Sequence, residues 1–400
     1  MPPPPDGRTF LGDRIRVADP PLGAGWPHAR AVCQGGQRRV SHAPLPLLFP
    51  LLRQGGRVNL QPGIPQLLSV IAPCRNEREH IVAFCANVAA MQLPHGWQIE
   101  VLIADGASDD GTRELLGDWC AKDARFQMTD NPQRIVSPGL NRCIVQSRGE
   151  IIVRLDIHSE YASDYFVQCV NTLARTGADN VGGAWHAEGR TPMQKAVAAA
   201  FQSPWVAGGA LSRNLEYEGE VDTVYLGCWP RATFAKVGGF DEQLVRNQDD
   251  EHNLRLKKSG GRIWQSKTIR STYFPRGKLP LVFKQYSQYG YWKPFVMKKH
   301  GQAAALRHLV PAVFVVALLV ALVLAFTVAA WPLGLLVGAY ACLLMLALWG
   351  MRSQLEPGMA TRVIGVIAAY HFGYGWGSLC GWRDVLLGRG PQPQWGALTR

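Results

Sequence analysis

The chain has 400 residues, which is enough for one large or two modest domains. Its formal net charge is +12, but the Lys and Arg residues cluster near the N-terminus and again from Arg255 to Arg307, just before an apolar block. This distribution is typical of the cytoplasmic face of a membrane and not of a nucleic-acid-binding surface. The nine cysteines are scattered singly, with no C-x-x-C pair, and therefore support neither a zinc site nor a disulfide framework.

Residues 1–64 are rich in Pro, Gly and Arg and show no sustained hydrophobic period. We therefore expect a disordered N-terminal extension. A translation start further along the chain is the alternative interpretation of this segment.

Strands and helices alternate after this extension. Leu67–Ala72 predicts a strand, and the turn Pro73–Glu77 leads to a helix over Glu79–Met91. A second strand, Ile99–Ala104, ends at the acidic turn Asp105–Thr112, and another helix follows. This order predicts an α/β domain over residues 65–300 with a mainly parallel central sheet and right-handed crossovers.

A short β-branched strand, Ile151–Leu155, runs directly into Asp156 and His158. Side chains two positions apart on an extended chain point the same way, so this carboxylate and imidazole leave the sheet edge together. Such a pair can hold a divalent metal, and the metal can hold a diphosphate. A polar turn without function is the alternative for this pair taken alone.

Two further acidic turns accompany this pair, one at Asp105 and the other at Asp249, Asp250 and Glu251. A nucleotide-sugar transferase needs a carboxylate for the nucleoside, a metal for the leaving diphosphate and a general base for the acceptor hydroxyl. Taken alone, each turn could be only a helix cap or an acidic first helical turn. Their order along the chain favours the chemical interpretation.

The C-terminal part, residues 301–400, predicts a membrane region. No charged residue occurs from Leu309 to Gly350, which is long enough for two spans, at about 309–330 and 332–350. A weaker third stretch at 362–382 either spans the membrane or lies at its interface. Lys293, Lys298 and neighbouring basic residues precede the first span. The positive-inside rule then predicts a multi-pass protein of the inner (cell) membrane, with a cytoplasmic catalytic domain.

Several motifs together resemble family 2 glycosyltransferases of GT-A fold. Ser69–Ala72 followed by Pro73-x-x-Asn76-Glu77 resembles the first strand and turn of that family. The second turn is similar at Asp105–Thr112, Asp156-x-His158 stands in place of D-x-D, and Gly238–Glu242 with Gln248-Asp249 stands where the family has GGFDE and E-D. Gln285–Trp292 is similar to its Q-x-x-R-W region. Within the family, the pattern is most similar to bacterial exopolysaccharide glucosyltransferases of the succinoglycan type.

The resemblance implies a role for each matching residue. Pro73, Glu77 and Asp105 would line a uridine pocket, and Asp156 would contact the ribose and the metal. His158 would be a second metal ligand or a direct diphosphate contact, and Asp249 would be the general base. Four further residues would bind the acceptor, the two tryptophans as sugar-stacking platforms: Trp229, Asp250, Gln288 and Trp292. The implied cofactor is a divalent metal, Mn²⁺ or Mg²⁺, and an imidazole ligand suits Mn²⁺ better.

The implied activity is an inverting transfer of a sugar, with glucose as first candidate, from a UDP-sugar to a lipid-linked oligosaccharide at the membrane. Other polysaccharide-assembly enzymes are candidate partners, and no nucleic acid is expected. Two alternatives stay open at this point. The acceptor could be a polyprenyl phosphate, or the chain could be a catalytically inactive membrane protein that binds nucleotide or glycan.

Overall fold

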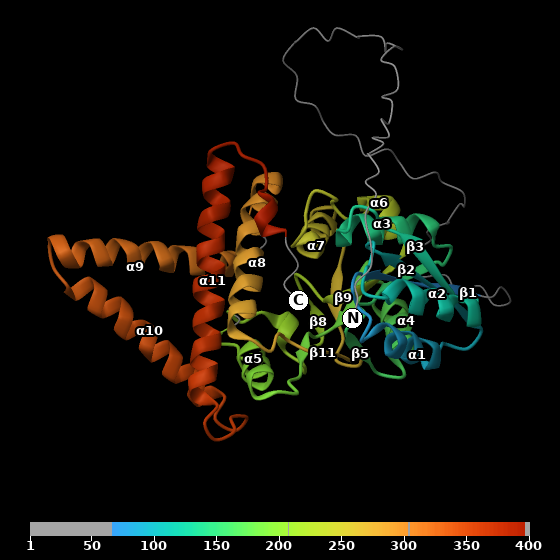
Figure 1. Ribbon diagram of the computed structural model, residues 1–400, viewed down its shortest axis with the longest axis horizontal. Coiled ribbons are helices and arrows are strands. Elements are labelled where there is room, and N and C mark those ends of the chain that lie inside the picture. The colour runs from blue at the N-terminus through green and yellow to red at the C-terminus, as the bar shows by residue number, and fades with distance from the viewer. Residues whose placement is uncertain (1–65, 207, 303–304, 397–400) are drawn as a thin grey trace, which may run out of the picture. The chain divides into compact units, whose positions relative to one another are not determined.

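A computed structural model of the chain describes residues 66–206, 208–302 and 305–396. The predicted N-terminal extension, residues 1–64, lies outside these described residues. The described part contains a central α/β body followed by four long helices (Figure 1).

The central sheet has eight strands in the order β3-β2-β1-β4-β9-β6-β10-β8. Pairing is parallel from β3 through β2 and β1 to β4, and again between β6 and β10. Strand β9 is antiparallel to both β4 and β6, and β8 is antiparallel to β10. The strands are β1 Gln66–Cys74, β2 Trp97–Asp105, β3 Phe126–Asp130, β4 Ile151–Arg154, β6 Asn180–Gly183, β8 Gly219–Glu220, β9 Tyr225–Pro230 and β10 Ile263–Gln265. The predicted α/β class with a mainly parallel sheet is confirmed.

The two faces of the sheet bury alternate residues of the same strands. In β1, Leu68 and Val70 face one hydrophobic core while Ile71 faces the other, as the period of two requires. The first core is covered by α1 Ile81–Ala90, α2 Thr112–Lys122 and α4 Tyr165–Thr176, and the second by α3 Val136–Gln146 and α6 Arg231–Val237. A fully buried Leu or Ile contributes about 1.5 to 3 kcal/mol. The continuous apolar runs in the sequence therefore reflect strands buried on both faces.

A second, three-stranded sheet has the order β5-β11-β7. Its strands are β5 Ser159–Tyr161, β7 His186–Ala187 and β11 Ser271–Tyr273. Two further helices of this body are α5 Pro192–Gln202 and α7 Gln248–Lys258. Helix α5 starts with a capping box, in which Thr191 accepts from the Gln194 backbone N–H and Gln194 accepts from that of Thr191.

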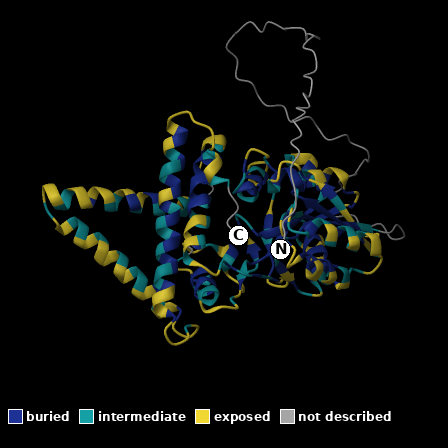
Figure 2. Cartoon of the chain, viewed as in Figure 1, coloured by how far each residue is buried: buried dark blue, intermediate teal, exposed yellow. Residues whose placement is uncertain are grey.

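Four long helices follow: α8 Leu279–His300, α9 Val310–Thr327, α10 Trp331–Gly350 and α11 Ala360–Leu386. Single-turn 3₁₀ helices lie at Leu211–Arg213, Leu306–His308 and Pro393–Trp395. Among the described residues, two helices are long and apolar enough to cross a membrane, Leu306–Thr327 with mean hydropathy 3.1 and Trp331–Gly350 with 2.1. Both are largely exposed (Figure 2).

The third apolar stretch of the sequence lies inside α11, which packs along α8 (Figure 1). Three glycines four residues apart, Gly373, Gly377 and Gly381, permit this approach. A Cβ atom at Gly377 would lie 1.9 Å from the Ser287 carbonyl oxygen, and one at Gly381 would lie 2.3 Å from that of Tyr291. Small residues at this spacing let two helix backbones come together. The stretch therefore lies in a helix that packs against α8, and this helix is not among the two that are apolar enough to cross a membrane within the described residues.

Candidate active site

One cavity of about 950 Å³ opens at the carboxyl ends of the parallel strands. Its walls come from the turn after β1, the end of β4, the start of α7, and helices α8 to α11. Crevices at this edge of an α/β sheet are where such proteins bind ligands. The predicted site residues that line the cavity are Pro73, Glu77, Asp156, His158, Asp249 and Asp250.

The turns after β1 and β2 are tied together by side chains. The Asn76 amide donates to the Asp109 carboxylate at 2.9 Å and accepts from the Asp109 backbone N–H at 3.1 Å. The Glu77 backbone N–H donates to the Thr112 hydroxyl at 2.9 Å. Asn76 has φ of 54°, a left-handed conformation that Asn tolerates better than most residues. The two turns therefore form one rigid wall, with the buried Glu77 side chain facing the cavity.

Asp105 lies behind this wall and is fully buried. Its Oδ2 pairs with Arg113 Nη1 at 2.7 Å, and Arg113 also reaches Asp130 at 2.8 Å. Its Oδ1 is buried and has no hydrogen-bond partner among the described residues. Gly106, and not Asp105, lines the cavity. A buried acceptor without a partner is costly, but Oδ1 lies behind the wall and does not face the cavity, so the prediction that Asp105 lines the nucleoside pocket is corrected by its burial.

Asp156 and His158 share a turn between β4 and β5. The Tyr161 hydroxyl accepts from the Asp156 backbone N–H at 2.7 Å and donates to the Asp156 carbonyl oxygen at 3.0 Å. His158 Nδ1 lies 3.6 Å from Glu77 Oε1. The turn thus brings the carboxylate and the imidazole to the same cavity wall, beside the wall that carries Glu77.

This pair fits a divalent metal that takes its other ligands from a substrate. Among the described residues, no group of three His, Cys, Asp or Glu side chains is placed to hold a metal by itself. Mg²⁺ and related ions are commonly held by one or two protein carboxylates together with substrate phosphates and water. Asp156 Oδ and a His158 ring nitrogen are suitable donors for such an ion, and imidazole is compatible with Mn²⁺.

Helix α7 begins beside this pair with Gln248, Asp249 and Asp250. Its N-cap, Asn247, has φ of 62°, and its side-chain amide donates to the Tyr289 carbonyl oxygen at 3.0 Å. The Asp249 carboxylate accepts from the Asp250 backbone N–H at 2.9 Å. Burial, and next the neighbouring charge of Asp250, raises the pKa of Asp249. A carboxylate with a raised pKa at the edge of a cavity has the properties of a general base.

Asp250 forms an ion pair with Lys293 of α8, whose side chain is only 3% exposed. Burial alone would raise the pKa of Asp250, but the charge of Lys293 and other basic groups outweighs it and the pKa is lowered. The two adjacent carboxyls of α7 are therefore shifted in opposite directions. Such a separation makes Asp249 the better candidate for a general base, while Asp250 keeps its negative charge beside Lys293.

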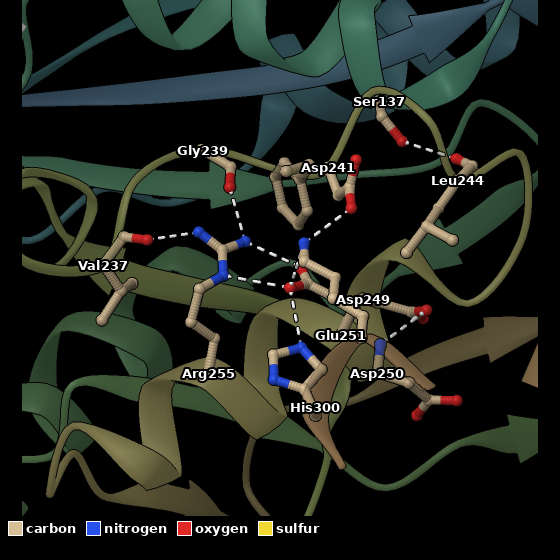
Figure 3. Close-up of polar contacts among 12 residues, drawn as sticks. Ser137, Val237, Gly239, Asp241, Leu244, Asp249, Asp250, Glu251, Arg255 and His300 are labelled. Atoms are coloured by element: carbon tan, nitrogen blue, oxygen red, sulfur yellow. Dashed lines mark hydrogen bonds and ion pairs between the residues drawn. The ribbon is translucent and has the colours of Figure 1, made fainter. Parts of the chain in front are cut away.

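Glu251 anchors α7 through several polar contacts (Figure 3), and it does not line the cavity. It is fully buried, and Arg255 bonds both of its oxygens, at 3.2 and 2.8 Å. Lys299 and His300 of α8 reach its Oε1 at 2.8 and 3.0 Å. Arg255 also donates to the carbonyl oxygens of Val237 and Gly239. Although burial opposes the effect, these partners lower the pKa of Glu251 to about 2.

Trp229 and Trp292, the predicted sugar-stacking residues, are buried and do not line the cavity. Trp229 is 2% exposed, and its ring packs among Phe234, Phe240 and His252 in the core beneath the sheet. Trp292 is 3% exposed and donates from Nε1 to the Trp395 carbonyl oxygen. Neither ring lines the cavity. The prediction that these tryptophans stack on a sugar is corrected by their burial.

Gln288 also lies behind the cavity wall and is 1% exposed. Its Oε1 accepts from Arg246 Nε at 3.2 Å, and Arg246 itself lines the cavity. Gln288 can therefore act on a ligand only by positioning this arginine. Other aromatic side chains do line the cavity, among them Trp185, Tyr225, Tyr273, Tyr286 and Tyr289.

Two features of the site are not predicted from the sequence. Arg154 ends β4 and lines the cavity beside Asp156, and its only trace in the sequence is that it interrupts an apolar strand. The cavity also continues between the apolar helices, where its wall is formed by Val310, Phe314, Leu336, Ala339 and Leu343 of α9 and α10. A sequence signal for this continuation does not exist, because it depends on how α9 and α10 pack against α11.

The chain is similar in sequence to known glycosyltransferases. A family model described as glycosyl transferase family 2 matches residues 69–228. The succinoglycan biosynthesis protein ExoA of Rhizobium meliloti (strain 1021) is 33% identical over 323 residues, covering 79% of this chain and 94% of that protein.

More distant relatives and a solved structure are also similar. A dolichyl N-acetyl-α-D-glucosaminyl phosphate 3-β-D-2,3-diacetamido-2,3-dideoxy-β-D-glucuronosyltransferase of Methanococcus voltae is 24% identical, covering 58% of this chain and 74% of that protein. The mannosyltransferase PcManGT of Pyrobaculum calidifontis, solved with GDP-Man and Mn²⁺, superposes with a TM-score of 0.51 at 18% identity, over 80% of this chain and 88% of that chain. At this identity the structural likeness concerns the fold.

Proposed function

Because this chain belongs to glycosyl transferase family 2, and is a glycosyltransferase of GT-A fold, we propose that it transfers a sugar from a UDP-sugar to a lipid-linked saccharide. Glucose is the first candidate for the sugar, and cell-surface polysaccharide synthesis is the proposed context. One observation carries the proposal: a single cavity joins Asp156 and Asp249 at the sheet edge to the apolar side chains of α9 and α10. Family membership favours this enzymatic role over a binding-only role.

The donor nucleoside would occupy the wall made by the turns after β1 and β2. Pro73 and Glu77 line it, and Asp105, buried behind the wall, would support it through its ion pair with Arg113. Asp156, at the end of β4, would receive the ribose hydroxyls. The solved PcManGT complex holds a different nucleotide, GDP-Man, so the base is the part of the donor that most needs a direct test.

A divalent metal would be held by Asp156 and His158. When bound, it supplies Lewis-acid neutralisation of the diphosphate that leaves with the nucleoside. The presence of Mn²⁺ with PcManGT supports this choice of cofactor class.

The transfer itself needs one base. An acceptor hydroxyl oxygen forms a bond to the anomeric carbon while the bond from that carbon to the diphosphate breaks, and the electron pair of the broken bond remains on the diphosphate. Asp249 takes the hydroxyl proton, which its raised pKa favours. A single displacement from the opposite face inverts the configuration. Asp250, fixed by Lys293, lies next to the base and would bind an acceptor hydroxyl.

The acceptor would lie toward α8 with its lipid toward α9 and α10. Trp185 and Tyr289 line the cavity and replace Trp229 and Trp292 as the proposed sugar-stacking surfaces. The apolar wall between α9 and α10 suits an alkyl or isoprenoid chain, because burying its methylenes is favourable by about 0.8 kcal/mol each. The two exposed apolar helices, with basic residues before them, would anchor the enzyme in the inner membrane with its catalytic domain in the cytoplasm.

The acceptor class is tested with purified full-length protein, radiolabelled UDP-glucose and a bacterial lipid extract. We expect label in the organic phase, and mild acid should release it as a di- or oligosaccharide. Release of a labelled monosaccharide alone would identify a polyprenyl phosphate as the acceptor. No transfer from any of several UDP-sugars would contradict the proposed donor.

A further inference from the structure

Arg154 is a buried cation that the mechanism above leaves without a role. It is the last residue of β4, and the rest of that strand, Ile151–Val153, is apolar and buried. The residue is 7% exposed, yet its side chain reaches the wall of the cavity that holds Asp156 and Asp249. An arginine at this depth is uncommon, because removing its charge from water is costly unless the charge is paired and hydrogen-bonded.

Only some of the N–H donors of this guanidinium have acceptors among the described residues. Its one ion pair among the described residues joins Nη2 to Asp156 Oδ1, at the long distance of 3.3 Å. Its Nε is buried and has no hydrogen-bond partner there. A guanidinium carries five N–H donors, so several donors in this position are left for a ligand. Some N–H donors of this buried guanidinium thus have no acceptor in the described protein, as in an anion-binding site without its anion.

The residues near Arg154 indicate which kind of anion would bind there. Asp156 lies on the turn that would carry the donor ribose and metal, and the charges of Asp156 and Asp249 both act on Arg154. A ligand here therefore lies between the donor-binding turn and the general base, which is where the bond to the leaving group breaks. Arginine matches two oxygens of a phosphate with two parallel N–H groups, a geometry that lysine lacks.

We propose that Arg154 binds the diphosphate of the nucleotide-sugar donor through the N–H groups that the protein leaves unused. This inference rests on the proposed function and adds a residue to it. The guanidinium places a permanent positive charge beside the oxygen that becomes negative as the sugar departs. Part of the stabilisation of the leaving group is then supplied by the chain itself and persists when divalent metal is removed.

The test measures nucleotide binding and not turnover. Full-length wild type, Arg154→Met and Arg154→Lys are titrated with UDP by calorimetry and with uridine by saturation-transfer NMR, in EDTA and in Mn²⁺. We expect Arg154→Met to lose about ten- to hundredfold in UDP affinity in EDTA, as for a charge-assisted hydrogen bond, while uridine affinity changes less than about twofold. The UDP affinity of Arg154→Lys should lie between those of the wild type and Arg154→Met, because lysine keeps the positive charge but lacks the two parallel N–H groups of arginine. Arg142→Met is the matched control, since Arg142 is exposed on α3 and lies outside the cavity lining.

Each other outcome counts against the inference. If Arg154→Met lowers the affinities for UDP and for uridine equally, the role of Arg154 is structural. Unchanged UDP affinity with a raised KM for the lipid acceptor would assign Arg154 to an acceptor phosphate instead. If the wild type binds none of UDP, GDP and dTDP, the proposed donor class is itself wrong and the inference falls with it; binding of UDP that Arg154→Met leaves intact removes the inference alone.

Discussion

The Tyr161 hydroxyl bonds both backbone groups of Asp156, accepting from its N–H at 2.7 Å and donating to its carbonyl oxygen at 3.0 Å. Tyr161 is 6% exposed and belongs to β5, so the turn that carries Asp156 and His158 is closed by a residue three positions after that turn's imidazole. The backbone of Asp156, the carboxylate proposed to bind the donor, is therefore positioned by the protein itself.

Tyr161→Phe should loosen this turn. The Asp156 N–H loses its partner, at a cost of about 1 to 3 kcal/mol, and the donor KM should rise more than kcat falls. Steady-state kinetics with varied UDP-sugar measure the split. Tyr217→Phe removes a hydroxyl that donates to the Glu220 carbonyl oxygen, and because Tyr217 does not line the cavity it should leave both constants unchanged. An unaltered donor KM in Tyr161→Phe would show that the turn does not need this bond.

Asp250→Asn should move the acid limb of the kcat profile to lower pH. The base must be ionised, so activity falls as pH drops through the raised pKa of Asp249. Asp250 is one cause of that raised pKa, and in its absence the nearby Lys293 acts on Asp249 without compensation. Both effects lower the pKa of Asp249. A limb that stays in place, or moves upward, would mean that another group is the base.

Glu251→Gln should destabilise the fold strongly. It leaves Arg255, Lys299 and His300 facing a neutral amide, and breaking a buried pair in this way costs about 3 to 5 kcal/mol. Thermal unfolding in detergent measures the loss. The matched control is Glu220→Gln, because its pair with Arg262 is exposed and contributes little. Equal melting temperatures for the two variants would contradict the anchoring role of Glu251.

The same residue predicts a pH dependence of stability. The folded pKa of Glu251 is about 2, below its ordinary value of 4.5, so its contribution is complete above about pH 4.5 and is lost as pH falls toward 2. The stability of the wild type should decline more steeply over this range than that of Glu251→Gln. Parallel declines in the two proteins would show that other carboxyls control acid unfolding.

Gly377→Ala should disturb the packing of α11 on α8. The new Cβ would lie 1.9 Å from the Ser287 carbonyl oxygen, and overpacking of this kind costs about 1 to 3 kcal/mol. Gly338→Ala is the control, since nothing lies within 4 Å of a Cβ at Gly338 in α10. A lower melting temperature for Gly377→Ala alone is expected. If both variants melt like the wild type, α11 does not pack on α8 as described.

Much of the α/β body could be predicted from the sequence, because its signals are local. The strands near Val70 and Val101 are apolar runs bounded by turns, and the acidic turns at Asp105 and Asp156 follow strand ends. Parallel pairing of β2, β1 and β4 then brings those turns to one edge. Asp249 lines the same cavity but comes from the start of α7, after α6 and a loop, so strand pairing alone does not predict its position.

The errors arise where function depends on packing between distant segments. Trp229 was expected to face a sugar, but Phe234, Phe240 and His252 enclose it, and no local pattern reports that enclosure. The sequence of the 362–382 stretch is compatible with a spanning or an interfacial helix, and its packing depends on contacts with α8 at Gly377 and Gly381. In the sequence Arg154 only interrupts an apolar strand, because the lack of a hydrogen-bond partner for its Nε among the described residues is visible only in the three-dimensional structure.

The most direct test of the central claim is UDP release by wild type and Asp249→Asn, with UDP-glucose, a lipid extract and either Mn²⁺ or EDTA. We expect the wild type to release UDP only when the extract is present, and Mn²⁺ should increase this release. Asp249→Asn should lose release by several orders of magnitude while it still binds UDP with wild-type affinity. Substantial release by Asp249→Asn would contradict the assignment of Asp249 as the base, and wild-type UDP binding without release for any UDP-sugar would contradict the proposed transfer itself.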